Sequence, residues 1–237
     1  MPATTLIDRW ILERLDDVVQ TCRSAYESFE FHKIYHTLNQ FCAVDLSSLY
    51  IDITKDRMYC DLPNSPRRRA TQTAMLELFD ALCRLLAPVL VFTAEEAWRH
   101  SAPNGSIHLE EFPIPHNRGK QASGQVQELL RLRGIIGPAI EHARQEKLIG
   151  NTLEARVVLN SDSEVTKDIP KEELEEFFIV SDLTIHQAKE ASASVAKTSY
   201  KKCARCWRHR PTVGTSKEHP DLCDRCESVV ITMTKSE

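Results

Sequence analysis

The chain has 237 residues, of which 42% are hydrophobic and 27% charged, and only 7 are glycine. This is enough apolar material for one large or two modest domains, and so little glycine favours long amphipathic helices over glycine-rich β or dinucleotide-binding folds. No stretch has the pattern of a signal peptide or a membrane span. The net charge of −4 argues against a uniformly basic surface. We expect a soluble, cytoplasmic protein without a membrane partner.

Two long helices are expected first. Apolar residues recur three or four positions apart through residues 4–30 and again through 31–53, which predicts amphipathic helices packed antiparallel on each other. The larger aromatic side chains on these and the later helices are expected in the core. They are Trp10, Tyr26, Tyr35 and Trp98.

A third helix is expected to begin after Ser65, which has the pattern of an N-cap followed by a proline at the first helical position. Ala87-Pro88 should bend or end it. Its predicted buried face consists of Met75, Leu76, Phe79, Leu82, Cys83 and Leu86. Thr93 and Glu96 have the spacing of a capping box, which predicts a short fourth helix.

The composition then turns to Pro, Asn, Gly and His, with Pro103-Asn104-Gly105 as a turn signal. A helix is expected over 126–147, interrupted near Gly134, Gly137 and Pro138. Alternation of apolar residues predicts strands at 153–159, 177–180 and 183–186. An Ala/Ser-rich stretch, 191–196, is compatible with either strand or linker.

The predicted fold class is therefore mainly α. An antiparallel helix bundle over 1–103 would be followed by a linker at 104–123, a small α/β unit at 124–199 and a C-terminal zinc ribbon or knuckle at 200–237.

Two pairs of cysteines near the C-terminus carry the strongest chemical signal. Cys203, Cys206, Cys223 and Cys226 form the motif C-x2-C-x16-C-x2-C, which falls in the spacing typical of zinc sites. Four thiolates fill the tetrahedral positions of Zn²⁺ and leave none for water, so one structural zinc ion is expected. Two disulfides, unrelated surface thiols or an iron–sulfur cluster are the alternatives.

The other cysteines, Cys22, Cys42, Cys60 and Cys83, are scattered, and no functional role is assigned to them.

A basic cluster surrounds the first cysteine pair. Its members are Lys201, Lys202, Arg205, Trp207, Arg208 and Arg210. Cations neutralise phosphates and an exposed indole can stack on an unpaired base, so this set is a candidate RNA-binding surface. The competing interpretation is that these cations offset the negative charge of the thiolates and that the indole covers the metal.

A second candidate patch consists of Arg67, Arg68 and Arg69 with Lys55 and Arg57, although these side chains are as readily explained as a solvated helix face. The phosphate-binding loop, the dinucleotide-binding glycine pattern and the nucleophile elbow do not occur in the sequence. No catalytic residue is therefore assigned.

A family resemblance rests on several motifs. The chain carries DRWIL at 8–12, FHKIY at 31–35, DLSSLY at 45–50, KDRMY at 55–59, FTAEEAW at 92–98 and SIHLE at 106–110. In this order they resemble the anticodon-binding helical domain of class I isoleucyl-, valyl- and leucyl-type tRNA synthetases. KCARCW at 202–207 and CDRC at 223–226 look like the zinc domain that ends many bacterial isoleucyl enzymes.

That resemblance implies the tRNA-binding C-terminal part of an ATP-dependent isoleucine–tRNA ligase, with isoleucine tRNA and the catalytic part of the same enzyme as partners. The catalytic motifs of the family, of the H-I-G-H and K-M-S-K-S type, are absent from the chain. ATP would bind only in the catalytic domain, and the chain alone should be inactive in aminoacylation and editing.

Two alternatives remain at this stage. Formamidopyrimidine-type DNA glycosylases end in a similar four-cysteine finger, but use an N-terminal proline with an adjacent glutamate, whereas here Pro2 is followed by Ala3. The other alternative is a free-standing nucleic-acid-binding protein.

Overall fold

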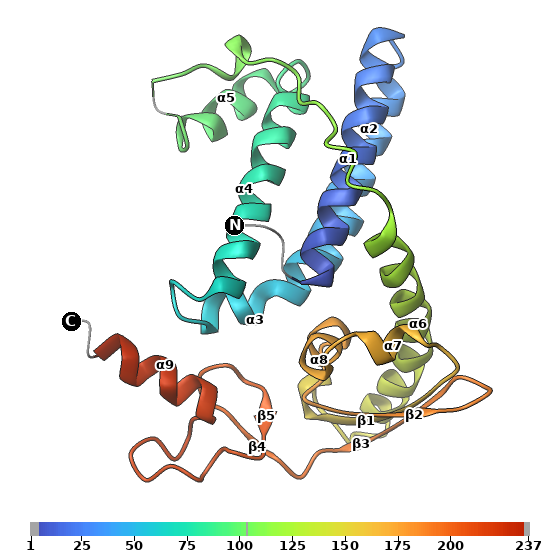
Figure 1. The fold of residues 1–237 in the computed structure, drawn as a ribbon, viewed down its shortest axis with the longest axis vertical. Helices are drawn as coiled ribbons and strands as arrows, with labels where there is room; N and C mark the ends of the chain where they lie inside the picture. The colour runs from blue at the N-terminus through green and yellow to red at the C-terminus, as the bar shows by residue number, and fades with distance from the viewer. Residues whose placement is uncertain (1–4, 103, 235–237) are drawn as a thin grey trace. The chain divides into compact units, whose positions relative to one another are not determined.

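The structure is a computed structural model that describes residues 5–102 and 104–234 (Figure 1). Pro2, Ala3 and Pro103, which the sequence singled out, lie outside the described residues. The chain forms two compact units: unit 1 is Met1–Asp52 with Arg69–Ser123, and unit 2 is Ile53–Arg68 with Gly124–Glu237. The four-part division predicted above stays a prediction.

The helices are α1 (Leu6–Glu27), α2 (Phe31–Gln40), a π-helix (Phe41–Ile51), α3 (Asp52–Cys60), α4 (Pro66–Leu86), α5 (Val91–Arg99), α6 (Gln121–Gln145), α7 (Val165–Asp168), α8 (Lys171–Phe178) and α9 (Asp224–Thr234). Short 3-10 helices lie at Ile107–Leu109 and Thr152–Glu154. The strands are β1 (Ala155–Ser161), β2 (Asp182–Gln187), β3 (Ser192–Lys197), β4 (Lys201–Lys202) and β5 (His209–Arg210). A mainly helical fold with a small sheet is thereby confirmed.

The first two helices of unit 1 pack side by side, as their apolar periodicity predicted (Figure 1). The second predicted helix differs in detail, because α2 continues through the π-helix into α3 and ends only at Cys60. The wider π-helical turn shifts the buried face, so that Phe41, Leu49 and Tyr50 point inward while Asp45 accepts a hydrogen bond from Arg14.

Three acidic residues of α1 organise unit 1 from within. Asp8 is fully buried and accepts hydrogen bonds from the hydroxyls of Tyr50 at 2.9 Å and Thr71 at 3.1 Å. Glu13 accepts from the backbone N–H groups of Ala122 and Ser123 near the start of α6, where a carboxylate is favoured by the free amide groups of a helix N-terminus. The third, Asp16, accepts from the amides of His116 and Arg118 in the connecting segment. The hydrogen bonds of these carboxylates therefore hold the helices of unit 1 and the connecting segment together.

The third helix begins as predicted, because the Ser65 hydroxyl accepts a hydrogen bond from the amide of Arg68. Its predicted buried face was partly wrong. Leu76 is 61% exposed, while Ala74 and Leu78 are buried instead. The side of a helix that faces the core depends on its neighbours, and an apolar residue beside the true face fits the same periodicity.

The predicted capping box at Thr93 was wrong. Helix α5 begins at Val91, so Thr93 lies inside its first turn. Another acid of this helix, Glu95, instead accepts hydrogen bonds from the hydroxyl of Ser106 and the amide of Ile107, both at 3.0 Å. The buried side chain of Trp98 packs in the small cluster that this contact closes.

Two predictions for unit 2 were wrong, one about the effect of Pro138 and one about a strand that begins at Phe177. The predicted interruption of the long helix was wrong, because α6 continues through Pro138, whose ring lies on the exposed side. The predicted strand at 177–180 was also wrong: Phe177 and Phe178 end the acidic helix α8, and Ile179 stops it in the left-handed region at φ 55°. Acidic side chains in the first turn favour this helix over a strand.

The sheet of unit 2 confirms the other strand predictions. Its order is β2-β1-β3, with β1 parallel to β2 and antiparallel to β3. Leu159 lies in register with Ile185 on one side and Ala193 on the other, so the Ala/Ser-rich stretch is a strand. Figure 1 shows α7 and α8 beside this sheet.

We predict that Tyr50→Phe destabilises unit 1 by about 2 kcal/mol, because buried Asp8 then loses one hydroxyl donor to its charged carboxylate. Tyr35→Phe is the matched control, since Tyr35 is 65% exposed, contrary to its predicted core position. Urea denaturation of both variants measures the difference. Equal midpoints for the two would contradict a stabilising role of the Tyr50 hydroxyl.

Candidate zinc and RNA-binding site

The four C-terminal cysteines converge on one point of unit 2. Cys203 and Cys206 lie in the turn between β4 and β5, and Cys223 and Cys226 lie at the start of α9. Their sulfur atoms all lie within 4.8 Å of one another, and the Sγ atoms of Cys206 and Cys223 are 3.9 Å apart. Elements separated by about 20 residues are thus brought together by the antiparallel pair β4–β5.

This geometry fits a single zinc ion. Four thiolates at about 2.3 Å from a tetrahedral Zn²⁺ place the sulfur atoms about 3.8 Å from one another, close to the 3.9 Å observed for Cys206 and Cys223. A disulfide would need an S–S distance of about 2.05 Å, and all cysteines within the described ranges are free thiols. In an iron–sulfur cluster the thiolates bind different irons, whereas sulfur atoms this close surround one ion.

The surroundings of the cluster favour bound metal. Hydrogen bonds among the cysteines lower the pKa of the Cys226 thiol and raise that of the Cys223 thiol, and the guanidinium groups of Arg205 and Arg225 further lower that of Cys226. A thiolate is the form that binds zinc. The apolar core of the module is small, with Val213, Leu222 and the partly buried Val230 beside the cysteines, so the metal would supply cohesion that burial alone does not.

The predicted RNA-binding residues fall into two groups, of which the first faces solvent. Lys201 and Lys202 on β4 are exposed, and Trp207 is 64% exposed. Trp207 has a positive φ of 64°, and the Lys202 ammonium lies 5.2 Å from the centre of its ring. The indole therefore stands outside the metal site with a cation over one face.

The second group points into unit 2. Arg205 donates from Nη1 to the carbonyl of Cys60 at 2.5 Å and approaches the Cys226 sulfur at 3.8 Å, so it caps the C-terminal end of α3. Arg208 is 4% exposed and donates to the Val180 carbonyl at 3.1 Å. The last cation, Arg210, pairs with Glu175 at 2.7 Å.

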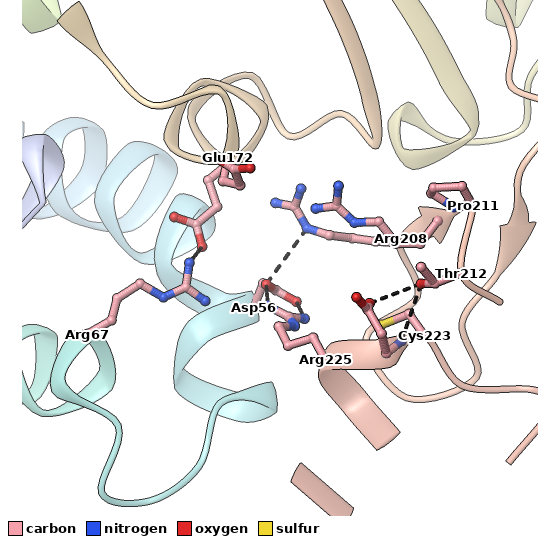
Figure 2. A pocket seen from close by; sticks show the side chains of 11 residues that line it. Asp56, Arg67, Glu172, Arg208, Pro211, Thr212, Cys223 and Arg225 are labelled. Carbon is pink, nitrogen blue, oxygen red and sulfur yellow. Dashed lines mark hydrogen bonds and ion pairs between the residues drawn. The ribbon is translucent and has the colours of Figure 1, made fainter. Parts of the chain in front are cut away.

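An ion-pair network joins α3 and the beginning of α4 to the rest of unit 2. The guanidinium of Arg57 contacts Glu176 at 2.5 Å, and these side chains are 1% and 2% exposed. Arg67 also contacts Glu176, at 2.9 Å. From α9, Arg225 forms two hydrogen bonds to Asp56 of α3, of 2.6 and 2.8 Å (Figure 2). Two members of the second candidate patch, Arg57 and Arg67, thus have acidic partners within the protein.

Sequence reasoning missed this network. Burial alone would raise the pKa of the Asp56 carboxyl, but the hydrogen bonds and charge of Arg225 hold it below its usual value. In the sequence, these residues of α3 were visible only as a run of charges in the KDRMY segment. The spacing of those charges does not reveal partners more than 100 residues away.

Two family models match the chain. The model described as the anticodon-binding domain of tRNA ligase matches residues 8–159. The chain belongs to this family. The model described as the zinc finger found in FPG and IleRS matches residues 201–229, which include all four clustered cysteines.

Curated relatives of this anticodon-binding chain are named isoleucine–tRNA ligase. That of Syntrophotalea carbinolica is 39% identical over 241 residues and that of Desulfitobacterium hafniense 40% identical over 246 residues. That of Carboxydothermus hydrogenoformans is 39% identical over 240 residues. Each alignment covers 94% of this chain and 26% of the relative, so the chain spans about a quarter of their length.

These matches confirm the predicted family and its zinc-binding finger. The finger model alone spans two classes of protein, as its description states. Residues 8–159 decide between them, because they match an anticodon-binding domain, and the DNA glycosylase alternative is not favoured. Among residues 5–102 and 104–234, no helix is both long and apolar enough to cross a membrane.

Removing zinc should loosen the C-terminal module and leave unit 1 unchanged. We predict that Cys203→Ser lowers bound zinc and speeds amide exchange in residues 201–234, because the small core there lacks other cohesion. Cys42→Ser, outside the cluster, is the control. Zinc analysis and hydrogen exchange of both variants provide the measurement, and full zinc content in Cys203→Ser would contradict the assignment.

Glu176→Gln should destabilise unit 2 by about 3 kcal/mol, since it removes the carboxylate that faces two arginines in a buried site. Glu172→Gln is the control one helical turn earlier on α8, where the side chain is exposed. Urea denaturation should show a lower midpoint for Glu176→Gln only. If both variants unfold like the wild type, the buried ion pair contributes nothing measurable.

Proposed function

We propose that this chain binds the anticodon arm of isoleucine tRNA within an isoleucine–tRNA ligase. One observation carries this proposal: a single chain combines an anticodon-binding domain at 8–159 with a zinc finger at 201–229, and its curated relatives over 94% of its length are named isoleucine–tRNA ligase. The geometry supports it with an exposed indole and two exposed lysines beside the four-cysteine cluster.

In this proposal one structural zinc ion is held by the thiolates of Cys203, Cys206, Cys223 and Cys226. All four ligands come from the protein, so no position is left for an activated water, and the metal shapes the surface instead of reacting. The cluster orients β4 and the turn that carries Trp207. Zinc binding and RNA binding are therefore coupled through the local fold.

RNA contact is assigned chiefly to Lys201, Lys202 and Trp207. Lysine ammonium groups neutralise phosphates, and an indole stacks on an unpaired base, which suits a single-stranded loop. Arg205, Arg208 and Arg210 belong to the same surface by sequence, but their protein contacts make them supports of its shape first.

Aminoacylation would belong to the part of such enzymes that this chain does not span. The ATP and isoleucine sites are placed there, and that catalytic part is the second proposed partner. The chain alone should bind tRNA without charging it, in the cytoplasm. Mixing the chain with tRNA, ATP and isoleucine should yield no aminoacyl-tRNA.

The direct test is a titration of the zinc-loaded chain with isoleucine tRNA and with a non-cognate tRNA across a salt series. Tighter binding of the isoleucine tRNA at every salt concentration supports anticodon recognition. Equal binding of both tRNAs with a steep salt dependence would reduce the function to a basic RNA-binding surface. Absence of binding to either would overturn the proposal.

We predict that Trp207→Ala weakens isoleucine tRNA binding about tenfold, because stacking of one base on an aromatic ring contributes about 1–3 kcal/mol. Trp207→Phe should recover most of that loss, since a ring remains.

For the cations, Lys202→Gln should lower both the affinity and the salt slope, whereas Lys217→Gln, at another exposed position of unit 2, should do so less. Equal effects of the two lysine variants would argue against a defined contact.

A further inference from the structure

Unit 2 exposes two of the tyrosine, tryptophan and phenylalanine side chains that it contains. Tyr59 on α3 is 78% exposed, and Trp207, in the turn between β4 and β5, is 64% exposed. Phe177 and Phe178 are buried, and Tyr200 is half-buried. A large ring that stays in water offers apolar surface to a partner. Trp207 already belongs to the proposed RNA-binding surface, whereas the proposed function leaves Tyr59 without a role.

Both exposed rings lie beside the same arginine, although α3 and the zinc module are far apart along the chain. Arg205 comes two residues before Trp207, and its Nη2 atom donates to the carbonyl oxygen of Tyr59 at 3.5 Å. Its Nη1 atom donates to the carbonyl of the next residue, Cys60. The Cys60 thiol in turn donates to the carbonyl of Arg205, at 3.8 Å. These contacts use main-chain atoms, and they place the backbone of Tyr59 against the turn that carries Trp207.

A second arginine holds the same helix against the zinc module. Arg225 lies between the cysteines of the second pair and forms two hydrogen bonds to Asp56, three residues before Tyr59 (Figure 2). Arg205 occupies the same position between the cysteines of the first pair. Each cysteine pair thus contributes one arginine that binds α3. The ring of Tyr59 is therefore fixed to the same body as the exposed indole.

The charges around Tyr59 suit an anionic partner. Lys55 is exposed one helical turn earlier on α3, and the two lysines of β4 are exposed on the zinc module. The acids of α3 and its C-terminal end that flank the ring, Asp56 and Asp61, each pair with an arginine of the protein, at 2.6 and 2.8 Å. A phosphate backbone would therefore meet exposed cations and compensated acids around this ring.

Single-stranded RNA is the partner that uses both the rings and the charge. An apolar protein surface would cover the rings but would leave the lysines without opposite charges. A double helix keeps its bases stacked on one another and out of reach of a side-chain ring. An unpaired base stacks on an aromatic ring whatever its identity, while lysine neutralises the phosphates beside it. The arrangement thus suits unpaired nucleotides in general and not one particular base.

We propose that Tyr59 is a second stacking platform for the bound tRNA and takes an unpaired base of the same single-stranded segment that contacts Trp207. The inference rests on the proposed function, which supplies the RNA. It extends the RNA-binding surface from the zinc finger at 201–229 onto α3, which lies within the anticodon-binding match at 8–159. Arg205 is a positioning residue in this arrangement, because its guanidinium is occupied by the end of α3.

The first test removes the ring of Tyr59 and leaves the helix in place. Tyr59→Ala should weaken isoleucine tRNA binding about tenfold, the loss of one stacked base. The hydrogen bond from Arg205 goes to the main-chain carbonyl, which the substitution does not change. Leu148→Ala removes an exposed apolar side chain elsewhere in unit 2 and should bind like the wild type. Zinc content and the urea midpoint verify that both variants are folded. Unchanged binding by Tyr59→Ala would overturn the contact.

The second test separates stacking from a general apolar contact. Tyr59→Phe keeps a ring and should bind tRNA within about twofold of the wild type, whereas Tyr59→Leu keeps apolar bulk without a ring and should lose nearly as much affinity as Tyr59→Ala. If Tyr59→Leu binds like the wild type while Tyr59→Ala does not, the residue makes an apolar contact of another kind and the stacking proposal is wrong.

The third test locates the contact directly. Ultraviolet irradiation of the complex joins a stacked ring to its base, so mass spectrometry should find a nucleotide attached to the peptide that carries Tyr59 and another attached to the peptide that carries Trp207. Attachment at Trp207 alone would confine the surface to the zinc module and overturn the proposal, with the proposed function left standing. If the wild type binds no tRNA, the proposed function and this contact are both overturned.

Discussion

The buried ion pair between Arg57 and Glu176 is the constraint on which the second unit depends. It joins residues 119 positions apart, at 1% and 2% exposure. Charges so deeply buried tolerate neither the loss of a partner nor a shift of the backbone, because an uncompensated charge in a poorly solvated site is costly. This explains why Ile53–Arg68 belongs to unit 2 although both flanking segments belong to unit 1.

The cations of the zinc module fall into two groups according to where their side chains point. Arg205 and Arg225 point inward, where one caps α3 at Cys60 and the other holds Asp56. Lys202 and Trp207 point outward and remain available to an RNA. Charge compensation therefore suits the inward-pointing members of the basic cluster, and the proposed RNA contact is left to the outward-pointing ones. A site of four thiolates carries negative charge, which the inward-pointing arginines offset. The outward-pointing Lys202 is not required for that compensation.

Prediction from sequence succeeded where residues close together in the chain determine the structure. It failed where packing against distant residues determines it. The spacing of Cys203 and Cys206 contains the geometry of a metal knuckle, and the structure brings the second pair within 4.8 Å. By contrast, the apolar run at 177–180 fits a strand as well as a helix end, and packing of α8 settled it. At Pro138, α6 continues although a proline removes one of the helix's own hydrogen bonds, and the residue type alone does not reveal this.

The sequence by itself determined the helical class, the metal-binding motif and the family resemblance, because periodicity and short spacings specify them within a few residues. Only the tertiary structure decided which basic residues face solvent, that α3 is tied to α8 through Glu176, and that Arg205 of the zinc module holds the end of α3 at Tyr59. The physical reason is that a charge finds its partner through space. A residue such as Arg57 carries no local mark of whether water or a carboxylate 119 positions away will satisfy it.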